Sequence, residues 1–406
     1  MSGSAIGTAA PDRGSPTLAI AVLAVAMFMA VTTEFSVVGL LPVLARDFDI
    51  SLARAGWFVT AFAVAAAVLG PLLTMAASRY APRRVLVVAV LVFALGNAVA
   101  ALTRSGTVVL AVRIVQGGLL PVLASIAIVS AARLAGHSRE GWASARVNQG
   151  VVATAVLGVP LTAMVAERLG WPASFGGLAM LGLVAAGLIG TLFPRLAGDP
   201  PASSRAAVSL LARPRFLAQL ALAGVLFTAM FAAYTYIAPL LSLVGTLDGV
   251  AVGWMLMLFG FAGVIGNAIA GRVARSDPVR VSAIGSGALA LVMTLLPSAG
   301  GHRLALVVLV IVWGAAHTAA FVFCQVGAMV AGRDAPAFAM ALNISVCNLG
   351  IALGALAGGA AADRFGTVAA GYAGAALAVV AVLVAGAIII VRPQAALSGR
   401  ELPSPD

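Results

Sequence analysis

The chain is 406 residues long, with 62% hydrophobic residues, only 9% charged residues and a formal net charge of +11. These values exclude a soluble globular domain, because a soluble chain of this length needs far more charged residues to keep its surface hydrated. They do not indicate nucleic-acid binding either. All 24 basic residues are arginines scattered through short connections, without a basic patch interleaved with aromatic residues.

Motifs of enzymes and metal sites are missing from the sequence. It carries no Cys/His ligand spacing, no phosphate-binding glycine loop and no nucleophile elbow. We therefore expect neither an enzyme nor an ATP-driven pump, and no metal ion or cofactor. The two cysteines, Cys324 and Cys347, lie in apolar tracts, which favours small packing residues over a disulfide.

Twelve apolar tracts follow one another along the chain, each near the roughly 20 residues that an α-helix needs to cross a bilayer. Continuous tracts of this length predict an all-α membrane protein rather than a barrel of alternating strands. The tracts cover residues 18–44, 55–77, 85–103, 107–132, 145–166, 174–194, 216–244, 252–273, 280–298, 303–331, 337–361 and 368–391.

The arginines are distributed unequally between the two sides of the predicted membrane. With the N-terminus inside, seventeen fall in the inner connections and tails, six fall outside, and Arg113 alone lies well within a tract. This bias obeys the positive-inside rule, so we expect both termini in the cytoplasm. Residues 1–16 and 393–406 are then cytoplasmic tails.

An internal repeat divides the chain into two halves. Pro42 matches Pro239, Gly56-Trp57 matches Gly253-Trp254, and Arg83 matches Arg280, all at an offset of 197 residues. The repeat predicts two pseudo-symmetric six-helix bundles, residues 17–195 and 216–392, joined by a cytoplasmic linker over 196–215. Parallel duplications of this kind place the substrate at the interface of the halves, near the midplane.

Two charged residues lie deep in the tracts, and both belong to the first half. Glu34 has Phe231 at its repeat position, and Arg113 has Val310. At about 1.5 Å per residue, the two charges lie within roughly one helical turn in depth. A carboxylate at this depth costs several kcal/mol of free energy unless it is protonated, paired with a cation or solvated by water. We therefore predict that Glu34 binds and releases protons. Protonation of Glu34 would release Arg113 and act as a conformational switch. The alternative is a static ion pair that fastens two helices.

Further polar residues in the tracts are candidates for substrate contacts. Most have a structural alternative: interfacial tyrosines for the aromatic pair, a neutral histidine bonded to a neighbouring helix, and asparagines that bridge helices. As an ionisable group, the histidine is also a candidate second proton site. The candidates are Gln116, Asn148, Tyr234, Tyr236, His317, Gln325 and Asn343.

Several motifs resemble the major facilitator superfamily, and within it the twelve-helix drug:proton antiporters near the bacterial sugar, arabinose and purine-nucleoside efflux permeases. Thr33-Glu34-Phe35 through Gly39-Leu40-Leu41-Pro42 resembles their first helix. The segment 112–118, with Arg113 three residues before Gln116-Gly117, resembles their fourth helix. The segments 150–171 and 343–354 resemble the antiporter motif of the fifth helix and the eleventh helix of the sugar-efflux group.

The resemblance implies functions for particular residues. It implies that Glu34 and Arg113 serve proton coupling, and that helices one, four, seven and ten line the cavity. It also implies that Gly150, Gly158 and Pro160 permit close packing and bending between the halves. The family's loop between helices two and three is degenerate here, because Ser78 stands in place of its aspartate. We expect the arginines of that loop to hold helix ends instead, namely Arg79, Arg83 and Arg84.

These features together predict a transporter that expels a small organic molecule, such as a sugar, nucleoside or drug, in exchange for protons. We expect a monomer whose partners are its substrate, protons and membrane lipid, with no nucleic acid. Proton-coupled uptake by the same fold is the nearest alternative. A lipid flippase or a non-transporting sensor is the more distant one.

Overall fold

The structure of the protein is a computed structural model that describes residues 16–194, 196, 210–273 and 277–397. Twelve helical segments in this part of the chain are long and apolar enough to cross a membrane, which confirms the twelve predicted tracts. The long helices are α1 (Pro16–Asp47), α2 (Leu52–Ser78), α3 (Pro82–Leu102), α4 (Gly106–Ala135), α5 (Glu140–Ala153), α6 (Val159–Leu169), α7 (Trp171–Leu192), α9 (Pro214–Tyr234), α10 (Ile237–Gly245), α11 (Gly249–Val273), α12 (Pro278–Leu295), α13 (Arg303–Ala331), α14 (Pro336–Phe365) and α15 (Val368–Leu397). Three short helices lie between them: η1 (His137–Arg139), η2 (Thr154–Gly158) and η3 (Leu296–Ala299).

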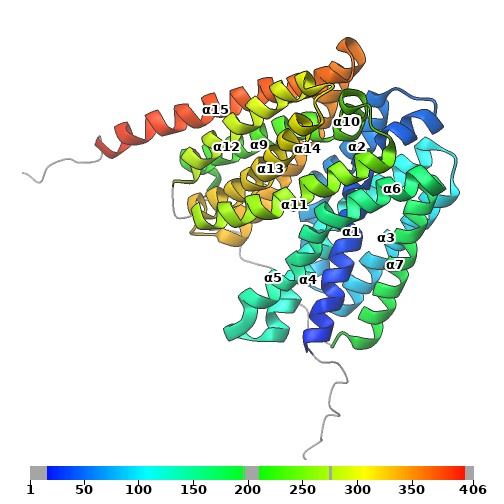
Figure 1. The fold of residues 1–406 in the computed structure, drawn as a ribbon. Helices are drawn as coiled ribbons and strands as arrows, with labels where there is room; N and C mark the ends of the chain where they lie inside the picture. Colours follow the sequence, from blue (N-terminus) through cyan, green and yellow to red (C-terminus); the bar gives the residue numbers. More distant parts are fainter. Residues whose placement is uncertain (1–15, 195, 197–209, 274–276, 398–406) are drawn as a thin grey trace, which may run out of the picture.

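The helices form two bundles, α1 to α7 and α9 to α15 (Figure 1). The starts of corresponding helices keep the repeat that the sequence predicts. Gly249 of α11 follows Leu52 of α2 by 197 residues, and Arg303 of α13 follows Gly106 of α4 by the same number of residues.

The two ends of the molecule are named by where the chain starts. We call the end where α1 begins the termini end, and the other end the opposite end.

The seventh predicted tract, residues 216–244, is not one helix. It breaks at Thr235 and Tyr236 into α9 and the short α10. Pro239 accounts for the break, because a proline cannot donate to the carbonyl four residues earlier and its ring clashes with that carbonyl. Pro42, its repeat counterpart, lies inside the continuous helix α1.

The fifth span is α5, η2 and α6 in sequence, with η2 wound as a π-helix. It packs closely on α1 through two glycines. A Cβ at Gly150 would lie 2.0 Å from the Ala24 carbonyl oxygen, and one at Gly158 would lie 2.2 Å from Oγ1 of Thr32. The hydroxyls of Thr32 and Thr154 are 3.2 Å apart at the same contact. Single π-turns of this kind occur often at functional sites in helices.

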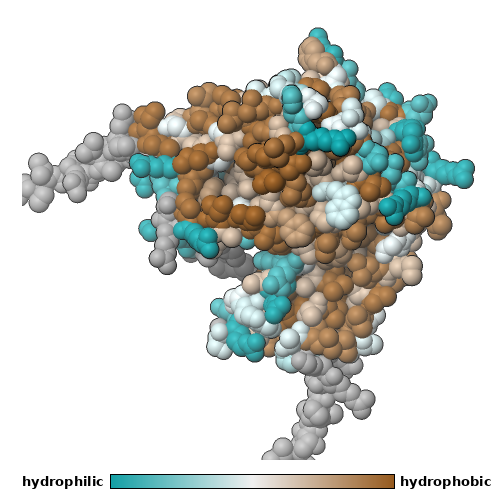
Figure 2. All heavy atoms as spheres, viewed as in Figure 1, coloured by the Kyte–Doolittle hydropathy of each residue, from teal (hydrophilic) through white to brown (hydrophobic). Residues whose placement is uncertain are grey.

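Hydrophobic side chains cover the flanks of the molecule, and hydrophilic ones gather toward the helix ends (Figure 2). This distribution fits a protein whose sides face lipid, because hydrocarbon offers no hydrogen bonds to polar groups. The predicted tails, 1–16 and 393–406, and the predicted linker, 196–215, fall largely outside the described residues.

The two bundles meet at the opposite end through α2 and α14. The carboxylate of Asp363 on α14 accepts hydrogen bonds from the Ser51 hydroxyl, at 2.8 Å, and the Ala53 backbone N–H, at 3.4 Å. An acidic group of one bundle therefore sits at the N-terminus of a helix of the other, where the helix dipole favours it. Nearby, the Tyr236 hydroxyl donates to the Ala355 carbonyl at 2.8 Å and fills the space that Gly56 leaves open.

Replacing Asp363 with alanine removes this contact between the bundles. We expect backbone amides at the start of α2 and the end of α14 to exchange hydrogen for deuterium faster, because the opposite end opens more often. The control is a change at the neighbouring residue, Arg364, which is exposed. Arg364→Gln should leave the exchange unchanged. Equal protection in native protein and Asp363→Ala would show that the carboxylate does not hold the bundles together.

Candidate functional site

Arg113 on α4 is almost fully buried, at 1% exposure. Its guanidinium donates to three backbone carbonyls: Thr33 at 2.6 Å, Glu34 at 2.6 Å and Phe58 at 3.1 Å. The guanidinium also lies 4.4 Å from the centroid of the Phe62 ring. A buried cation must be satisfied by hydrogen bonds or charge, and here carbonyl dipoles and a ring face do so. Arg113 thus fixes α1 and α2 against α4.

Glu34 does not form the direct ion pair with Arg113 that the sequence predicts as an alternative. Its side chain is buried, and no hydrogen bond or ion pair of its carboxylate occurs in the described part of the chain. The carboxylate is close enough to interact electrostatically with Arg113 and with the Tyr234 phenol. The planar fork of Arg113 binds two successive carbonyls of α1, so the arginine uses the backbone of residue 34 and leaves its side chain without a hydrogen bond.

A polar network next to Arg113 ties α1, α3 and α4 together. The Asn97 amide donates to the Thr33 hydroxyl at 2.8 Å, and the Gln116 amide donates to the Asn97 oxygen at 3.1 Å and to the Phe93 carbonyl at 3.2 Å. Gln116 therefore bridges helices inside the first bundle, and its contact with substrate stays a prediction. Asn97 is a site residue that the sequence analysis missed, although an asparagine in an apolar tract was the available signal.

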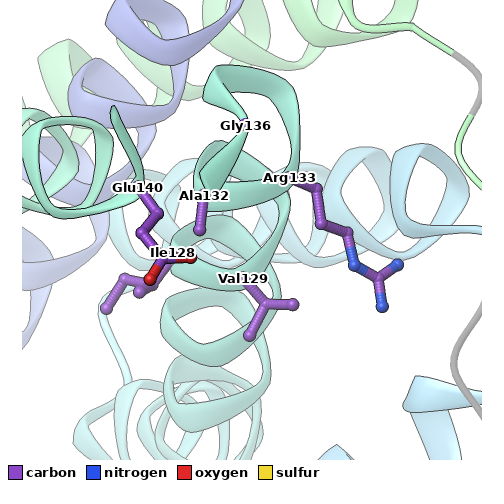
Figure 3. A pocket seen from close by; sticks show the side chains of 6 residues that line it. All are labelled: Ile128, Val129, Ala132, Arg133, Gly136 and Glu140. Carbon is purple, nitrogen blue, oxygen red and sulfur yellow. The ribbon is translucent and has the colours of Figure 1, made fainter. Parts of the chain in front are cut away.

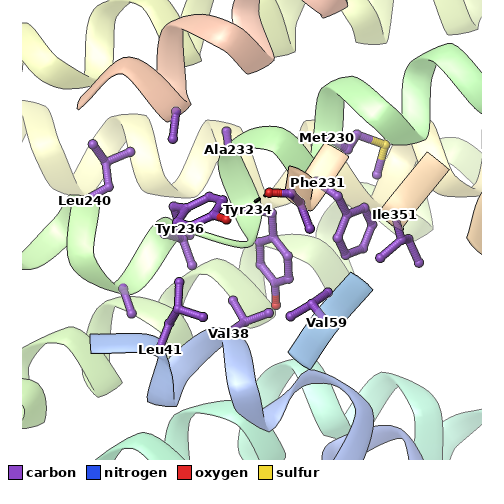
Figure 4. Packing of buried hydrophobic residues seen from close by; sticks show 14 of the residues in the cluster. Val38, Leu41, Val59, Met230, Phe231, Ala233, Tyr234, Tyr236, Leu240 and Ile351 are labelled. Atoms are coloured by element: carbon purple, nitrogen blue, oxygen red, sulfur yellow. Dashed lines mark hydrogen bonds between the residues drawn. The ribbon is translucent and has the colours of Figure 1, made fainter. Parts of the chain in front are cut away.

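Aromatic side chains from both bundles meet next to Glu34. The cluster, hereafter the aromatic cluster, comprises Phe35, Phe231, Tyr234, Phe259, Trp313 and His317. Phe35 stacks on Phe231 across the interface, with ring centroids 5.9 Å apart. The Tyr234 ring extends from α9 toward Val38 and Val59 of the first bundle (Figure 4).

His317 lies inside the aromatic cluster, where the sequence predicts a substrate contact or second proton site. Its ring centroid is 4.9 Å from that of Tyr234, 5.5 Å from Phe259 and 5.7 Å from Phe231. Nδ1 of His317 and Nε1 of Trp313 are both buried without a hydrogen-bond partner in the described structure. Buried polar atoms usually have a hydrogen-bond partner. These two nitrogen atoms therefore remain unused hydrogen-bonding groups beside the interface of the bundles.

The other candidate contacts are scattered. Tyr236 is fully buried and its hydroxyl bonds Ala355, so it belongs to the closed contact between the bundles. Asn343 is buried on α14, and neither atom of its amide has a hydrogen-bond partner in the described structure. Gln325 is half-buried on α13, two turns beyond His317, and Asn148 is exposed on α5. Only Tyr234 and His317 lie in the aromatic cluster.

The residues of the conformational motifs lie at several packing contacts. Arg83 donates to the Gly190 carbonyl and fastens α3 to α7 at the termini end. Arg79 and Arg84 are exposed at the same end. Gly150 and Gly158 pack within the first bundle, on α1, whereas the Pro160 carbonyl lies against Gly253 of the second bundle. Cys324 and Cys347 are both free and buried, which confirms the prediction of packing residues.

The fold and sequence are shared with known transporters. The family model of the Major Facilitator Superfamily matches residues 23–333, which is well over half of the chain. The chain belongs to this superfamily. It is 32% identical to the inner membrane transport protein YdhP of Escherichia coli K12, over 83% of this chain and 87% of the relative. It is 27% identical to the uncharacterized MFS-type transporter YbcL of Bacillus subtilis, over 94% of this chain and 98% of the relative.

A solved structure shares the same fold. The crystal structure of the human organic anion transporter MFSD10 (TETRAN) superposes with a TM-score of 0.63, at 18% sequence identity, over 93% of this chain and 100% of that one. These matches confirm the family and the twelve-helix fold inferred from the motifs. The protein is a multi-pass membrane transporter of the superfamily, and its resemblance to the efflux permeases stays a prediction.

A double-mutant cycle separates the carbonyl contacts of Arg113 from an ion pair with Glu34. We expect Arg113→Gln to lower the free energy of unfolding by at least about 2 kcal/mol, because buried carbonyls lose charged donors. Glu34→Gln removes no hydrogen bond and should cost much less. An enclosed Glu34 that carries a proton has no charge to interact with Arg113. The coupling energy between the two changes, measured by thermal unfolding in detergent, should therefore stay below about 0.5 kcal/mol. A coupling of about 2 kcal/mol or more would establish a direct pair.

Proposed function

We propose that this transporter exports a small amphipathic organic molecule across a bacterial inner membrane in exchange for protons, with Glu34 as the proton-binding group. One observation supports the proposal above the others. Glu34 is the only buried acidic side chain among the described residues, it has no hydrogen bond or ion pair, and it lies beside the aromatic cluster at the interface of the bundles.

The cost of an unsatisfied charge explains how Glu34 would bind and release a proton. An ionised carboxylate in a low-dielectric interior is unfavourable by several kcal/mol unless it gains water or a partner. Glu34 would therefore carry a proton while it is enclosed. A substrate that enters the aromatic cluster, with a donor or a positive group near Glu34, would stabilise the ionised form and release the proton.

The arrangement of the bundles gives the proposed direction. They touch at the opposite end, through Asp363 and Ser51, and along α11 as far as Gly260, whose missing Cβ leaves room for the Ala155 carbonyl. The excess of arginines supports a cytoplasmic location for the termini end. Because the contacts between the bundles lie at the opposite end, we infer that substrate would enter and the proton would leave at the termini end. Rocking of the two bundles would expose the same site to the other side.

The composition of the aromatic cluster favours an aromatic or amphipathic substrate over a sugar. The cluster offers several ring faces but few hydrogen-bonding groups, chiefly those of Tyr234, Trp313 and His317. The human protein of the same fold is named an organic anion transporter. An anionic substrate is not favoured here, because Arg113, the only buried cation among the described residues, is already bonded to three carbonyls.

Transport in proteoliposomes tests the proposal. An imposed proton gradient should drive accumulation of an aromatic cationic drug against its concentration gradient, and adding the drug to purified protein should release protons into unbuffered solution. Glu34→Gln should abolish both effects, since an amide cannot exchange a proton. Chloramphenicol-like drugs, nucleosides and sugars are compared in the same assay.

The matched control is Asp47→Asn, the same chemical change on the same helix. Asp47 pairs with Arg46 at the exposed end of α1, and such surface pairs contribute only about 0–1 kcal/mol. This variant should release protons as the native protein does. Proton release that persists in Glu34→Gln would overturn the role of Glu34. Movement of proton and drug in the same direction would contradict antiport and identify a symporter.

A further inference from the structure

A large cavity opens at the termini end of the second bundle, away from the aromatic cluster. Its volume is about 1100 Å³. Its walls come from the starts of α9 and α12 and the ends of α13 and α15. The proposed transport mechanism assigns it no function.

Positive charge dominates the walls of this cavity. Arg213 and Arg215 line it from the start of α9, and Arg333 from the end of α13. Arg213 pairs with Asp334, whereas Arg215 and Arg333 have no acidic partner among the described residues. The acidic residue in the wall, Asp277, accepts a hydrogen bond from the Val279 backbone at 3.0 Å and so caps α12.

A buried amide in the wall also lacks a partner. Gln219 of α9 is only 3% exposed, and its Nε2 atom makes no hydrogen bond in the described structure. An amide N–H is a donor, so an acceptor is missing at this position. Leaving such a donor buried and unsatisfied costs about 1–3 kcal/mol. Rotation of the amide toward the cavity would let a bound anion accept this hydrogen bond and recover that cost.

The repeat shows that the first bundle has closed the equivalent place. There Arg83 of α3 donates to the Gly190 carbonyl of α7. The counterparts 197 residues later are Arg280 and Ala387. Arg280 turns instead to Asp277, at 4.0 Å, and Ala387 lines the cavity.

Polar wall residues of the cavity stand where the first bundle has non-polar residues. Arg215 replaces Leu18, and Gln219 replaces Val22, at the same offset of 197 residues. A hollow at this end of the first bundle is smaller, about 450 Å³, and there Arg133 and Glu140 extend in different directions (Figure 3). The polar groups of this cavity are thus particular to the second bundle and do not follow from the shared fold.

The outer walls of the cavity are apolar and face the lipid side. Val330 of α13 and Val391 of α15 both line it and are 60% and 62% exposed. A ligand that fits the whole cavity therefore combines an anionic group with hydrocarbon. Basic pockets between membrane helices bind phospholipid head groups in this way.

We propose that this cavity binds an anionic phospholipid of the leaflet at the termini end. Arg215, Arg333 and the Gln219 amide hold the lipid phosphate, and its acyl chains lie along Val330 and Val391. The N-terminus of α9 adds its dipole to the attraction for the phosphate. The site is separate from Glu34 and does not depend on the proposed antiport.

Titration of the purified full-length protein in a neutral maltoside detergent tests this site. The probes are short-chain phosphatidylglycerol, phosphatidylcholine of the same chain length, and inorganic phosphate. Phosphatidylglycerol should raise the midpoint of thermal unfolding in a saturable manner, because a ligand that binds only the folded state stabilises it. The other two probes should have little effect.

Two variants remove the head-group contacts. Arg215→Gln and Gln219→Val should each weaken the apparent affinity for phosphatidylglycerol about tenfold, as expected for the loss of a hydrogen bond to a charged group. Arg215 is exposed and valine is the residue at the repeat position of Gln219, so both variants should fold. Arg272→Gln, an exposed arginine at the same end outside the cavity, is the control.

Three results would overturn the proposal. Equal stabilisation by phosphatidylcholine would mean that acyl chains alone bind. Stabilisation by inorganic phosphate to the same extent would identify a free anion rather than a lipid. Unchanged affinity in both Arg215→Gln and Gln219→Val would place the lipid elsewhere on the protein.

Discussion

The packing of the first bundle depends on the hydrogen bonds of a buried arginine. Arg113 lies among apolar helices, and it is held by three carbonyl oxygens of α1 and α2 and by the Phe62 ring. Those contacts fix three helices relative to one another, with the Thr33–Asn97–Gln116 network beside them. Because backbone dipoles satisfy Arg113, the Glu34 carboxylate remains without a hydrogen-bonded partner. Binding of a proton or of a substrate can then determine whether this carboxylate is neutral or ionised.

The two halves of the repeat have diverged in complementary ways. The first bundle contributes the buried charges, and the second contributes rings and the unused hydrogen-bonding atoms of Trp313 and His317. They meet where Phe35 stacks on Phe231, the residue that stands at the repeat position of Glu34. This asymmetry places a titratable group and an aromatic surface on opposite sides of the one interface that alternating access must open and close.

The fold could be predicted almost completely from the sequence, whereas the site could be predicted only in part. Hydropathy over about 20 residues determines a membrane span, so all twelve were found. Helical spacing gives the depth of Glu34 and Arg113, but it does not tell whether a guanidinium meets a side chain or a backbone carbonyl. The effect of a proline on its helix could not be predicted either, because Pro239 breaks its helix and Pro42 does not. The pairing of Asp363 with Ser51 depends on how the bundles dock, which no local pattern records.

The measurement that tests the central claim most directly is infrared difference spectroscopy of the purified protein during substrate binding. Protonated and ionised carboxyl groups absorb at different frequencies, so the method reports the charge of Glu34 itself. A substrate should convert a protonated carboxyl band into a carboxylate band in the native protein, and this change should vanish in Glu34→Gln. An identical difference spectrum in the variant would contradict the account, because another group would then carry the proton.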